Sequence, residues 1–211
     1  MVNKITKTAE TENSPVRANR VSKAHIIQQY MENYGARYGL RELAAALGKP
    51  HQTIKPYVAR LVCENVLLRQ KRGKRADYVL NMLESRAYDY LVLAEKERLL
   101  DRLSRDTLLK VLVGKLSGFF SETIFVIFGS FAKGTKAGDI DMLATGREHF
   151  KHEIKNFEQV YNKEVHLIYA KNLKTLDMPL IKEVYKNHLV LNGTESIVRW
   201  FGELYGQNKL V

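Results

Sequence analysis

Two aspartates near the middle of the chain could do chemistry together. Asp139 and Asp141 open a hydrophobic segment, Asp139-Ile140-Asp141-Met142-Leu143. Side chains alternate along a β-strand, so a strand here places both carboxylates on one face and turns Ile140 and Met142 into the core. Two carboxylates that close repel each other unless a cation lies between them, and oxygen ligands at this spacing suit Mg²⁺. The pair therefore predicts a divalent-cation site.

A glycine-serine turn precedes this pair. Residues 123–128 form a continuous apolar and β-branched run, typical of a strand buried on both faces, and the run ends at Gly129-Ser130. A glycine lets the backbone approach a phosphate closely, and the Ser130 hydroxyl and nearby amides can donate to phosphate oxygens. The two motifs together predict a phosphate-binding turn beside a divalent cation.

The order of these features resembles the nucleotidyltransferase superfamily that includes DNA polymerase beta. Phe128-Gly129-Ser130-Phe131-Ala132-Lys133-Gly134, followed by Asp139-Ile140-Asp141, is similar to the minimal nucleotidyltransferases of archaea and bacteria. The resemblance covers about residues 106–205. It implies a polymerase-beta-like domain of the α+β class, with a mixed sheet and flanking helices.

The resemblance also implies roles and ligands. Gly129, Ser130 and Lys133 are expected to bind the nucleotide, and Asp139 and Asp141 to hold Mg²⁺ or Mn²⁺. The substrate is then ATP or another nucleoside triphosphate, whose nucleoside monophosphate, AMP in the case of ATP, passes to an unknown acceptor. Minimal nucleotidyltransferases often serve as antitoxins that modify a small helical HEPN toxin, so a HEPN-type protein is one acceptor to expect.

The family has a third carboxylate on a later strand, and this chain departs from that pattern. The later strand is predicted at Glu164–Tyr169, and the carboxylate position matches His166. Glu164 lies two residues earlier and shares a face with His166. Either Glu164 substitutes, or His166 acts as a base or ligand, or the site binds nucleotide without transferring it. A strand histidine with no catalytic role fits the sequence equally well.

The elements around the motif can be predicted from periodicity. Helical spacing predicts a linker helix over residues 86–103, a helix over 106–118 and a helix that opens at Asp177. A short strand at 188–191 and a final helix from Thr194 follow. The aromatic patch on this last helix is predicted to be core, with a partner-binding face as the alternative; its residues are Trp200, Phe201, Leu204 and Tyr205.

The N-terminal part carries most of the positive charge. Of the net +11, residues 1–85 contribute 15 Lys+Arg against 7 Asp+Glu, or +8, an asymmetry that indicates a nucleic-acid or anionic-surface contact. Three helices are predicted, at about residues 22–35, 40–48 and 49–65. Pro56 predicts a kink or a later start in the third helix. Two β-like runs then predict a hairpin, with five basic residues in its turn.

Three short helices followed by a basic hairpin resemble a winged helix-turn-helix domain over residues 22–82. In that family the third helix enters the DNA major groove and the hairpin wing follows the backbone or minor groove. The alternative is a protein-docking module whose basic wing is merely solvated. The resemblance implies that the DNA-contacting residues are His51, Gln52, Thr53 and Lys55 on the helix and Arg69, Lys71, Arg72, Lys74 and Arg75 on the wing.

Length and composition bound the rest. The 211 residues, 45% hydrophobic and 27% charged, allow two small globular domains. We expect a flexible leader at 1–21, the winged helix at 22–82, a linker helix at 83–105 and the nucleotidyltransferase domain at 106–211. The absence of a long apolar run or a signal-like N-terminus predicts a cytoplasmic protein without membrane contact. The single Cys63 is predicted to be a buried, inert thiol.

Two functions from different classes are compatible with this sequence. The first is a Mg²⁺-dependent nucleotidyltransferase with an attached DNA-binding winged helix. The second is a DNA-binding transcription regulator, antitoxin-like regulators included, whose nucleotidyltransferase domain is degenerate or only senses nucleotide. A homodimer is compatible with either, since winged helices on palindromic DNA are often dimers.

Overall fold

The computed structural model describes residues 21–73, 75–135 and 138–210. The expected leader lies outside these ranges except for Val21, which is buried. Lys74 and the side chain of Arg72, both expected to contact DNA, also lie outside the described residues.

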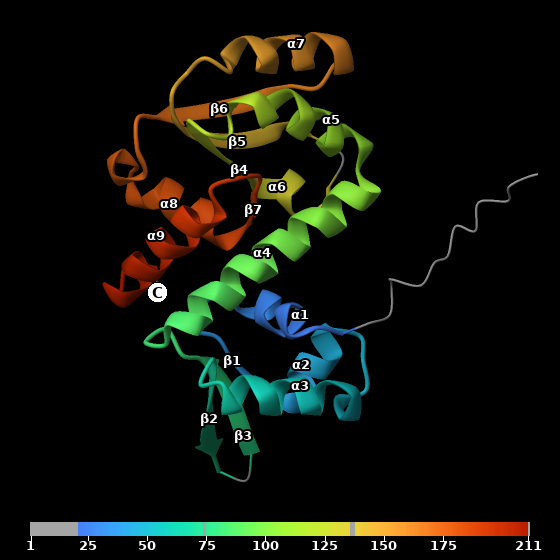
Figure 1. The fold of residues 1–211 in the computed structure, drawn as a ribbon, viewed down its shortest axis with the longest axis vertical. Coiled ribbons are helices and arrows are strands. Elements are labelled where there is room, and N and C mark those ends of the chain that lie inside the picture. Colours follow the sequence, from blue (N-terminus) through green and yellow to red (C-terminus); the bar gives the residue numbers. More distant parts are fainter. Residues whose placement is uncertain (1–20, 74, 136–137, 211) are drawn as a thin grey trace, which may run out of the picture.

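The N-terminal elements are three short helices and a small antiparallel sheet, drawn in blue to green in Figure 1. All three helices are present, although the first was predicted to extend to about residue 35 and its helical part ends at Tyr30. Strand β1 was not predicted, because three residues are too few to show a period. The sheet has the order β1-β3-β2. In chain order the elements are α1 (Lys23–Ile27), a 3₁₀ turn (Gln28–Tyr30), β1 (Arg37–Gly39), α2 (Leu40–Ala46), α3 (His51–Cys63), β2 (Leu67–Arg72) and β3 (Arg75–Leu80).

The structure corrects three details that the sequence predicted for this region. The hairpin strands pair from Leu67–Leu80 to Arg72–Arg75, so most of the basic residues expected in its turn lie on the strands. Helix α3 begins at His51 and includes Pro56, so there is no later start. Cys63 is also exposed rather than buried. It is the last residue of α3, away from the buried positions of that helix, which are Ile54, Val58 and Leu61.

The remaining elements form a second, larger group. The predicted helices and strands are confirmed. Two helices were not predicted: α6, a single turn at the Gly-Ser motif, and α7, which joins β5 to β6. The elements are α4 (Ser85–Arg105), α5 (Thr107–Leu116), a 3₁₀ turn (Ser117–Phe119), β4 (Thr123–Phe128), α6 (Gly129–Ala132), β5 (Ile140–Gly146), α7 (Lys151–Tyr161), β6 (Val165–Ala170), a 3₁₀ turn (Leu173–Thr175), α8 (Met178–Lys186), β7 (His188–Val190) and α9 (Thr194–Gly206).

The second sheet is mixed, in the order β6-β5-β4-β7. β4 pairs antiparallel with β5 and β7, while β5 and β6 are parallel, because the crossover through α7 returns the chain to the same end of the sheet. The α+β class and the mixed sheet with flanking helices are therefore confirmed. No helix in the described part of the chain is long and apolar enough to cross a membrane.

The two faces of this sheet bury different sets of side chains. Phe125 and Ile127 of β4 lie in one apolar cluster with side chains of α5 and α7. Val126 and Phe128, which alternate with them, lie in the other cluster with residues of α8 and α9. The aromatic patch of α9 belongs to this second cluster: Trp200, Phe201 and Leu204 are buried, as the core interpretation predicted.

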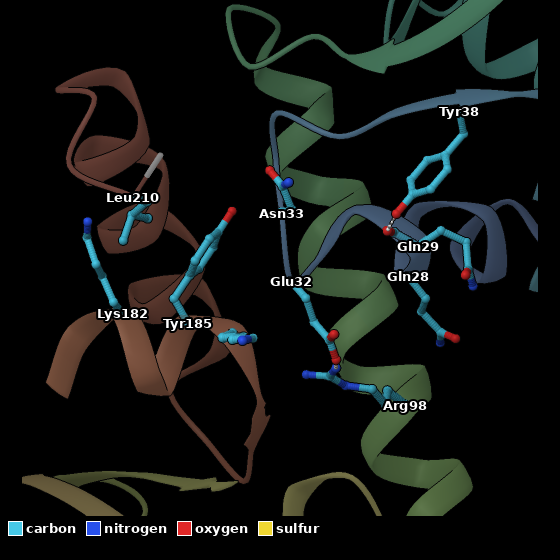
Figure 2. A pocket seen from close by; sticks show the side chains of 10 residues that line it. Gln28, Gln29, Glu32, Asn33, Tyr38, Arg98, Lys182, Tyr185 and Leu210 are labelled. Carbon is cyan, nitrogen blue, oxygen red and sulfur yellow. Dashed lines mark hydrogen bonds and ion pairs between the residues drawn. The ribbon is translucent and has the colours of Figure 1, made fainter. Parts of the chain in front are cut away.

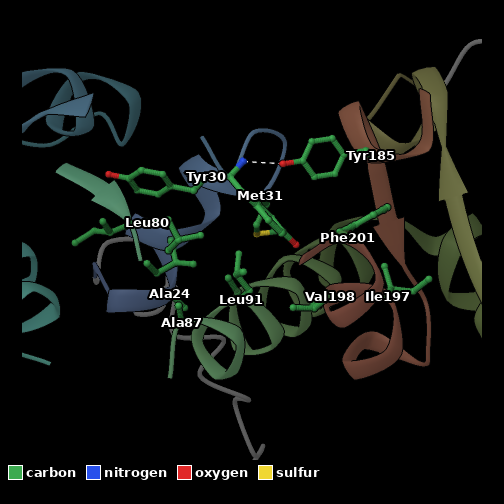
Figure 3. Close-up of a cluster of buried hydrophobic side chains, with 14 of the residues drawn as sticks. Ala24, Tyr30, Met31, Leu80, Ala87, Leu91, Tyr185, Ile197, Val198 and Phe201 are labelled. Atoms are coloured by element: carbon green, nitrogen blue, oxygen red, sulfur yellow. Dashed lines mark hydrogen bonds between the residues drawn. The ribbon is translucent and has the colours of Figure 1, made fainter. Parts of the chain in front are cut away.

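The second cluster extends into the N-terminal elements. Tyr30 and Met31 are buried together with Leu91 of α4 and Phe201 of α9 (Figure 3). The backbone N–H of Tyr34 donates a buried hydrogen bond of 2.6 Å to the hydroxyl of Tyr185 on α8. The N-terminal elements and the second sheet thus share a hydrophobic core, with α4 running between them (Figure 1).

Candidate active site

The turn that follows β4 brings Gly129 against Asp141. Phe128, the last residue of β4, lies opposite Asp141 in the antiparallel ladder, and Gly129 then adopts a φ of +70°. A Cβ at residue 129 would lie 2.5 Å from Oδ2 of Asp141. Only glycine satisfies both the positive φ and this close approach. The Gly-Ser turn and the Asp-x-Asp strand, which are separate motifs in the sequence, are therefore in contact.

The residues after Gly129 form a closed turn. The amide of Gly134 donates to the carbonyl of Phe131 at 3.0 Å, and the amide of Thr135 donates to the carbonyl of Ser130 at 3.2 Å. Phe131 is buried and anchors the turn, whereas Ser130 and Lys133 are exposed. The side chains of Ser130 and Lys133, which are expected to bind nucleotide, are thus accessible from solvent, while the buried Phe131 holds the backbone between them in place.

The parallel pairing of β5 and β6 brings His166 beside Asp141. These two residues are direct partners in the ladder, and Nδ1 of His166 lies 3.5 Å from Oδ1 of Asp141. Nε2 of His166 lies 3.6 Å from Oδ2 of Asp139 and 3.3 Å from Oε1 of Glu164. The structure therefore places the other three predicted catalytic residues, all carboxylates, around the imidazole of His166.

The three carboxylates raise the pKa of His166. Desolvation acts to lower it, but the charge of Asp139, the hydrogen bond and charge of Glu164 and the charge of Asp141 outweigh that effect, and the pKa is raised from 6.5. An imidazolium here neutralises part of the acidic cluster. Asp139 and Asp141 each lie within 3.6 Å of this side chain, which carries the opposing charge when it is protonated.

The same side chains include a group with the chemistry of a cation site. Asp139, Glu164 and His166 each offer one ligand atom, and these three atoms lie within 4.8 Å of one another. Asp141 is next to this group, because its carboxylate lies beside the other ring nitrogen of His166. The carboxylate oxygens suit Mg²⁺ or Mn²⁺, and the imidazole nitrogen is a donor that transition metals accept more readily than Mg²⁺. The residues present therefore fit a divalent cation.

The predicted DNA-contacting residues lie on a separate surface. All four residues at the start of α3 are exposed, as are Arg69, Lys71 and Arg75 of the hairpin. Arg69 and Lys71 lie on one face of the hairpin, because they are two residues apart on β2. Arg75 lies on the other face, since it is paired with residue 72. The basic charge therefore covers both sides of the hairpin rather than its tip alone.

A cleft of about 780 Å³ joins the start of α3 to the hairpin. His51 and Arg75 line it, together with Arg37 of β1, Arg41 of α2 and two carboxylates, Glu42 and Asp77. Sequence reasoning missed these two arginines. They stand well apart along the chain from the predicted contacts, and the basic character of the N-terminal half is the one signal that could have pointed to them.

Comparison with known proteins gives distant structural likenesses. No protein-family model and no curated protein matches this chain. Two crystal structures of mutants of the toxin–antitoxin MntA–HpeT are similar at TM-scores of 0.36 and 0.37, with 12% and 17% identity, over 47% of this chain and 86% and 87% of theirs. A crystal structure of a toxin–antitoxin with AMP-PNP has a TM-score of 0.36 and 15% identity, over 49% of this chain and 89% of that one. At these TM-scores the likeness assigns no activity or partner to this chain.

Proposed function

We propose that this protein is a nucleotidyltransferase that moves a nucleoside monophosphate, AMP in the case of ATP, from a nucleoside triphosphate to an acceptor. The acceptor oxygen forms a bond to the α-phosphorus, the bond between the α- and β-phosphates breaks, and pyrophosphate leaves. The observation that carries the proposal is the contact between Gly129 and Asp141, with Asp139, Glu164 and His166 at the same edge of the sheet. The turn would contact the phosphates of the nucleotide, and the carboxylates would hold the cation that accompanies them. In this structure the turn and the carboxylates lie next to each other.

Each residue has a role in this proposal. Gly129 lets the triphosphate approach the backbone, and the Ser130 hydroxyl and the Lys133 ammonium contact its oxygens from the exposed side of the turn. Asp139, Asp141 and Glu164 would hold Mg²⁺ or Mn²⁺. When bound, the cation neutralises the phosphate charge and orients the reacting oxygens. His166 stands at the position of the family's third carboxylate, and its neutral form can accept the proton of the acceptor hydroxyl.

The test uses binding before turnover, because binding needs no knowledge of the acceptor. Calorimetry with ATP, with and without Mg²⁺ or Mn²⁺, is compared between the wild type and the Asp139→Asn/Asp141→Asn double variant. Metal-dependent binding that the variant loses supports the site. Absence of binding by the wild type with either metal overturns it.

Transfer itself is tested on acceptors. ATP labelled at the α-phosphate is incubated with candidate proteins, beginning with the product of the adjacent gene and any HEPN-type protein there. Label should appear on an acceptor with the wild type and be absent with either single Asp→Asn variant. Retained transfer in those variants would remove the assignment.

For the N-terminal elements we propose a winged helix-turn-helix domain that binds DNA. The order of its helices and strands, the exposed α3 start and the basic hairpin support this, as does the cleft lined by Arg37, Arg41 and Arg75. In this arrangement α3 reads the major groove and the hairpin contacts phosphates. Binding to a DNA duplex should weaken steeply with salt, and a flat salt response would exclude it.

A second candidate function follows from His166. An imidazolium among three carboxylates supplies the positive charge that a cation would otherwise provide, which favours a DNA-binding regulator whose second domain no longer transfers nucleotides. The discriminating result is selective DNA binding that is unchanged in the Asp139→Asn/Asp141→Asn variant, together with no transfer to any acceptor.

A further inference from the structure

Arg102 of α4 forms a hydrogen bond with the backbone of the turn at Gly129–Gly134. Nη2 of Arg102 donates a hydrogen bond of 3.1 Å to the carbonyl of Phe131, and the guanidinium of Arg102 lies 5.8 Å from the centre of the Phe131 ring. That carbonyl also accepts the amide of Gly134. A Cβ at residue 134 would collide with Nη1 of Arg102, so the turn follows the shape of this guanidinium closely.

Arg102 is itself fixed in place. Its Nη2 lies 3.4 Å from Oδ2 of Asp106, whose other oxygen accepts the amide of Leu109 at 3.0 Å and caps α5. The side chain of Arg102 is 22% exposed and that of Asp106 is 11% exposed. Because both side chains are largely buried, the ion pair between Arg102 and Asp106 is screened less by solvent and salt than an ion pair on the surface.

One turn earlier on α4, Arg98 holds the strand on the other side of the motif. Arg98 donates to the carbonyl of His188 on β7 and pairs with the buried Glu95 at 3.0 Å. His188 lies opposite Phe128 in the ladder, and the carbonyl of the preceding Asn187 accepts the amide of Gly129 at 3.2 Å. The two arginines therefore support both ends of the Gly-Ser turn.

The same helix packs on the N-terminal elements. Ala87, Leu91 and Ala94 are buried on α4 in the cluster that includes α1. Nη1 of Arg98 also lies 3.9 Å from Oε1 of Glu32, and both side chains line the same side of a cleft of about 800 Å³, opposite Lys182 and Tyr185 of α8 (Figure 2). Helix α4 thus contacts the N-terminal elements and the turn by different parts of its length.

We propose that Arg102, supported by Arg98, is a positioning residue for the nucleotide-binding turn, so that α4 and not only the sheet sets the geometry of Gly129 and Ser130. This inference rests on the proposed nucleotide site and adds a residue to it. Arg102 acts through the Phe131 carbonyl and does not itself touch the nucleotide.

The first arm of the test needs no nucleotide. Hydrogen exchange of a peptide spanning residues 129–135 is compared in the wild type, Arg102→Met, Arg102→Lys and Arg105→Met. Methionine keeps the length of the stem and removes every donor. Arg105 is the matched control, because it lies on the same helix, is 77% exposed and pairs only weakly with Asp101 at 3.9 Å.

Arg102→Met should raise the exchange rate of the Gly134 and Thr135 amides about tenfold, since it removes a charge-assisted hydrogen bond to the turn. The amides of β4 should stay near their wild-type rates. Arg102→Lys should show a smaller rise, because it keeps the charge and one donor, and it carries the test alone if the methionine variant does not fold. Exchange equal to that of Arg105→Met, or a uniform rise across the sheet, would overturn the inference.

The second arm measures ATP affinity with Mn²⁺ and Mg²⁺ by calorimetry. Arg102→Met should raise the Kd about tenfold, with partial recovery in Arg102→Lys and no change in Arg105→Met. An unchanged Kd in Arg102→Met overturns the positioning role. If the wild type binds no ATP, the proposed function fails, and the exchange measurement still decides whether Arg102 holds the turn.

Discussion

The carboxylate of Asp141 occupies the space that a side chain at Gly129 would need. Its Oδ2 would lie 2.5 Å from a Cβ there, and the φ of +70° at residue 129 strains any residue with a Cβ. Gly129→Ala should therefore push Asp141 away from His166 and destabilise the fold by about 1–2 kcal/mol from the backbone strain alone. Nucleotide transfer should fall at least about 100-fold, since a displacement of about 1 Å is enough for that.

Gly114→Ala is the control for this substitution. Gly114 lies within α5, and a Cβ there would meet nothing within 4 Å, so alanine should stabilise the helix by about 0.5–1 kcal/mol and leave transfer unchanged. Thermal unfolding and the transfer assay measure both variants. Equal stability of the two would contradict the contact between Gly129 and Asp141.

The pKa of the His166 imidazole is a direct measure of its electrostatic coupling to Asp139. The neighbouring carboxylates raise the pKa of His166 from 6.5, so in metal-free protein the ring should stay protonated to a higher pH than an isolated histidine. The stabilisation that this pairing contributes is present at low pH and is lost as the pH rises through the raised pKa. NMR titration of the ring should show Asp139→Asn lowering that pKa.

Asp101→Asn is the matched control for this titration. Its carboxylate pairs with Arg105 on the surface of α4, and its removal should leave the His166 titration where it is in the wild type. A His166 pKa that does not respond to Asp139→Asn would show that the 3.6 Å approach of the two side chains has no electrostatic consequence.

A buried charge network under β7 should govern stability in acid. Oε1 of Glu95 lies 2.7 Å from Nε2 of His188, and both side chains are almost fully buried. Burial acts to raise the pKa of Glu95, but His188 and Arg98 outweigh it and the pKa is lowered from 4.5. The contribution of Glu95 to stability is therefore complete above pH 4.5 and is lost as the pH falls through its lower folded-state pKa.

Removing this charge should be costly. Glu95→Ala leaves Arg98 without its buried partner, and we expect a loss of about 3–5 kcal/mol near neutral pH. Glu122→Gln, which breaks an exposed pair with Arg147, should cost no more than about 1 kcal/mol. Chemical unfolding at pH 7 and pH 4 tests both. A wild-type-like unfolding curve for Glu95→Ala would refute the role of the network.

DNA binding should depend on the hairpin charges and not on charge in general. Neutralising Arg69, Lys71 and Arg75 to Gln should weaken binding to a DNA duplex and reduce the slope of log K against log salt by about 0.9 for each phosphate contact removed. The control neutralises the same number of exposed lysines on the second group of elements, Lys155, Lys171 and Lys174. Fluorescence anisotropy over a salt series separates the two, and an equal loss in both would indicate nonspecific attraction.

Much of this architecture is encoded locally. The apolar run before Gly129, the alternation around Asp139 and Asp141 and the spacing in α4, α8 and α9 each predicted an element that the structure contains, because burial follows the period of the backbone. Short β1 and the outward placement of Cys63 were missed, since three residues carry no period and a position at the end of a helix can face either way.

The sequence by itself determined which residue types stand at the site, and only the tertiary structure decided how they meet. The register of β4 with β5 sets Asp141 against Gly129, and the parallel pairing of β6 sets His166 beside Asp141. Arg102 reaches the turn, and Arg98 reaches the neighbouring strand β7, from a helix that ends well before the motif begins in the sequence. Such contacts depend on strand register and helix packing between distant segments, which no local pattern of residues specifies.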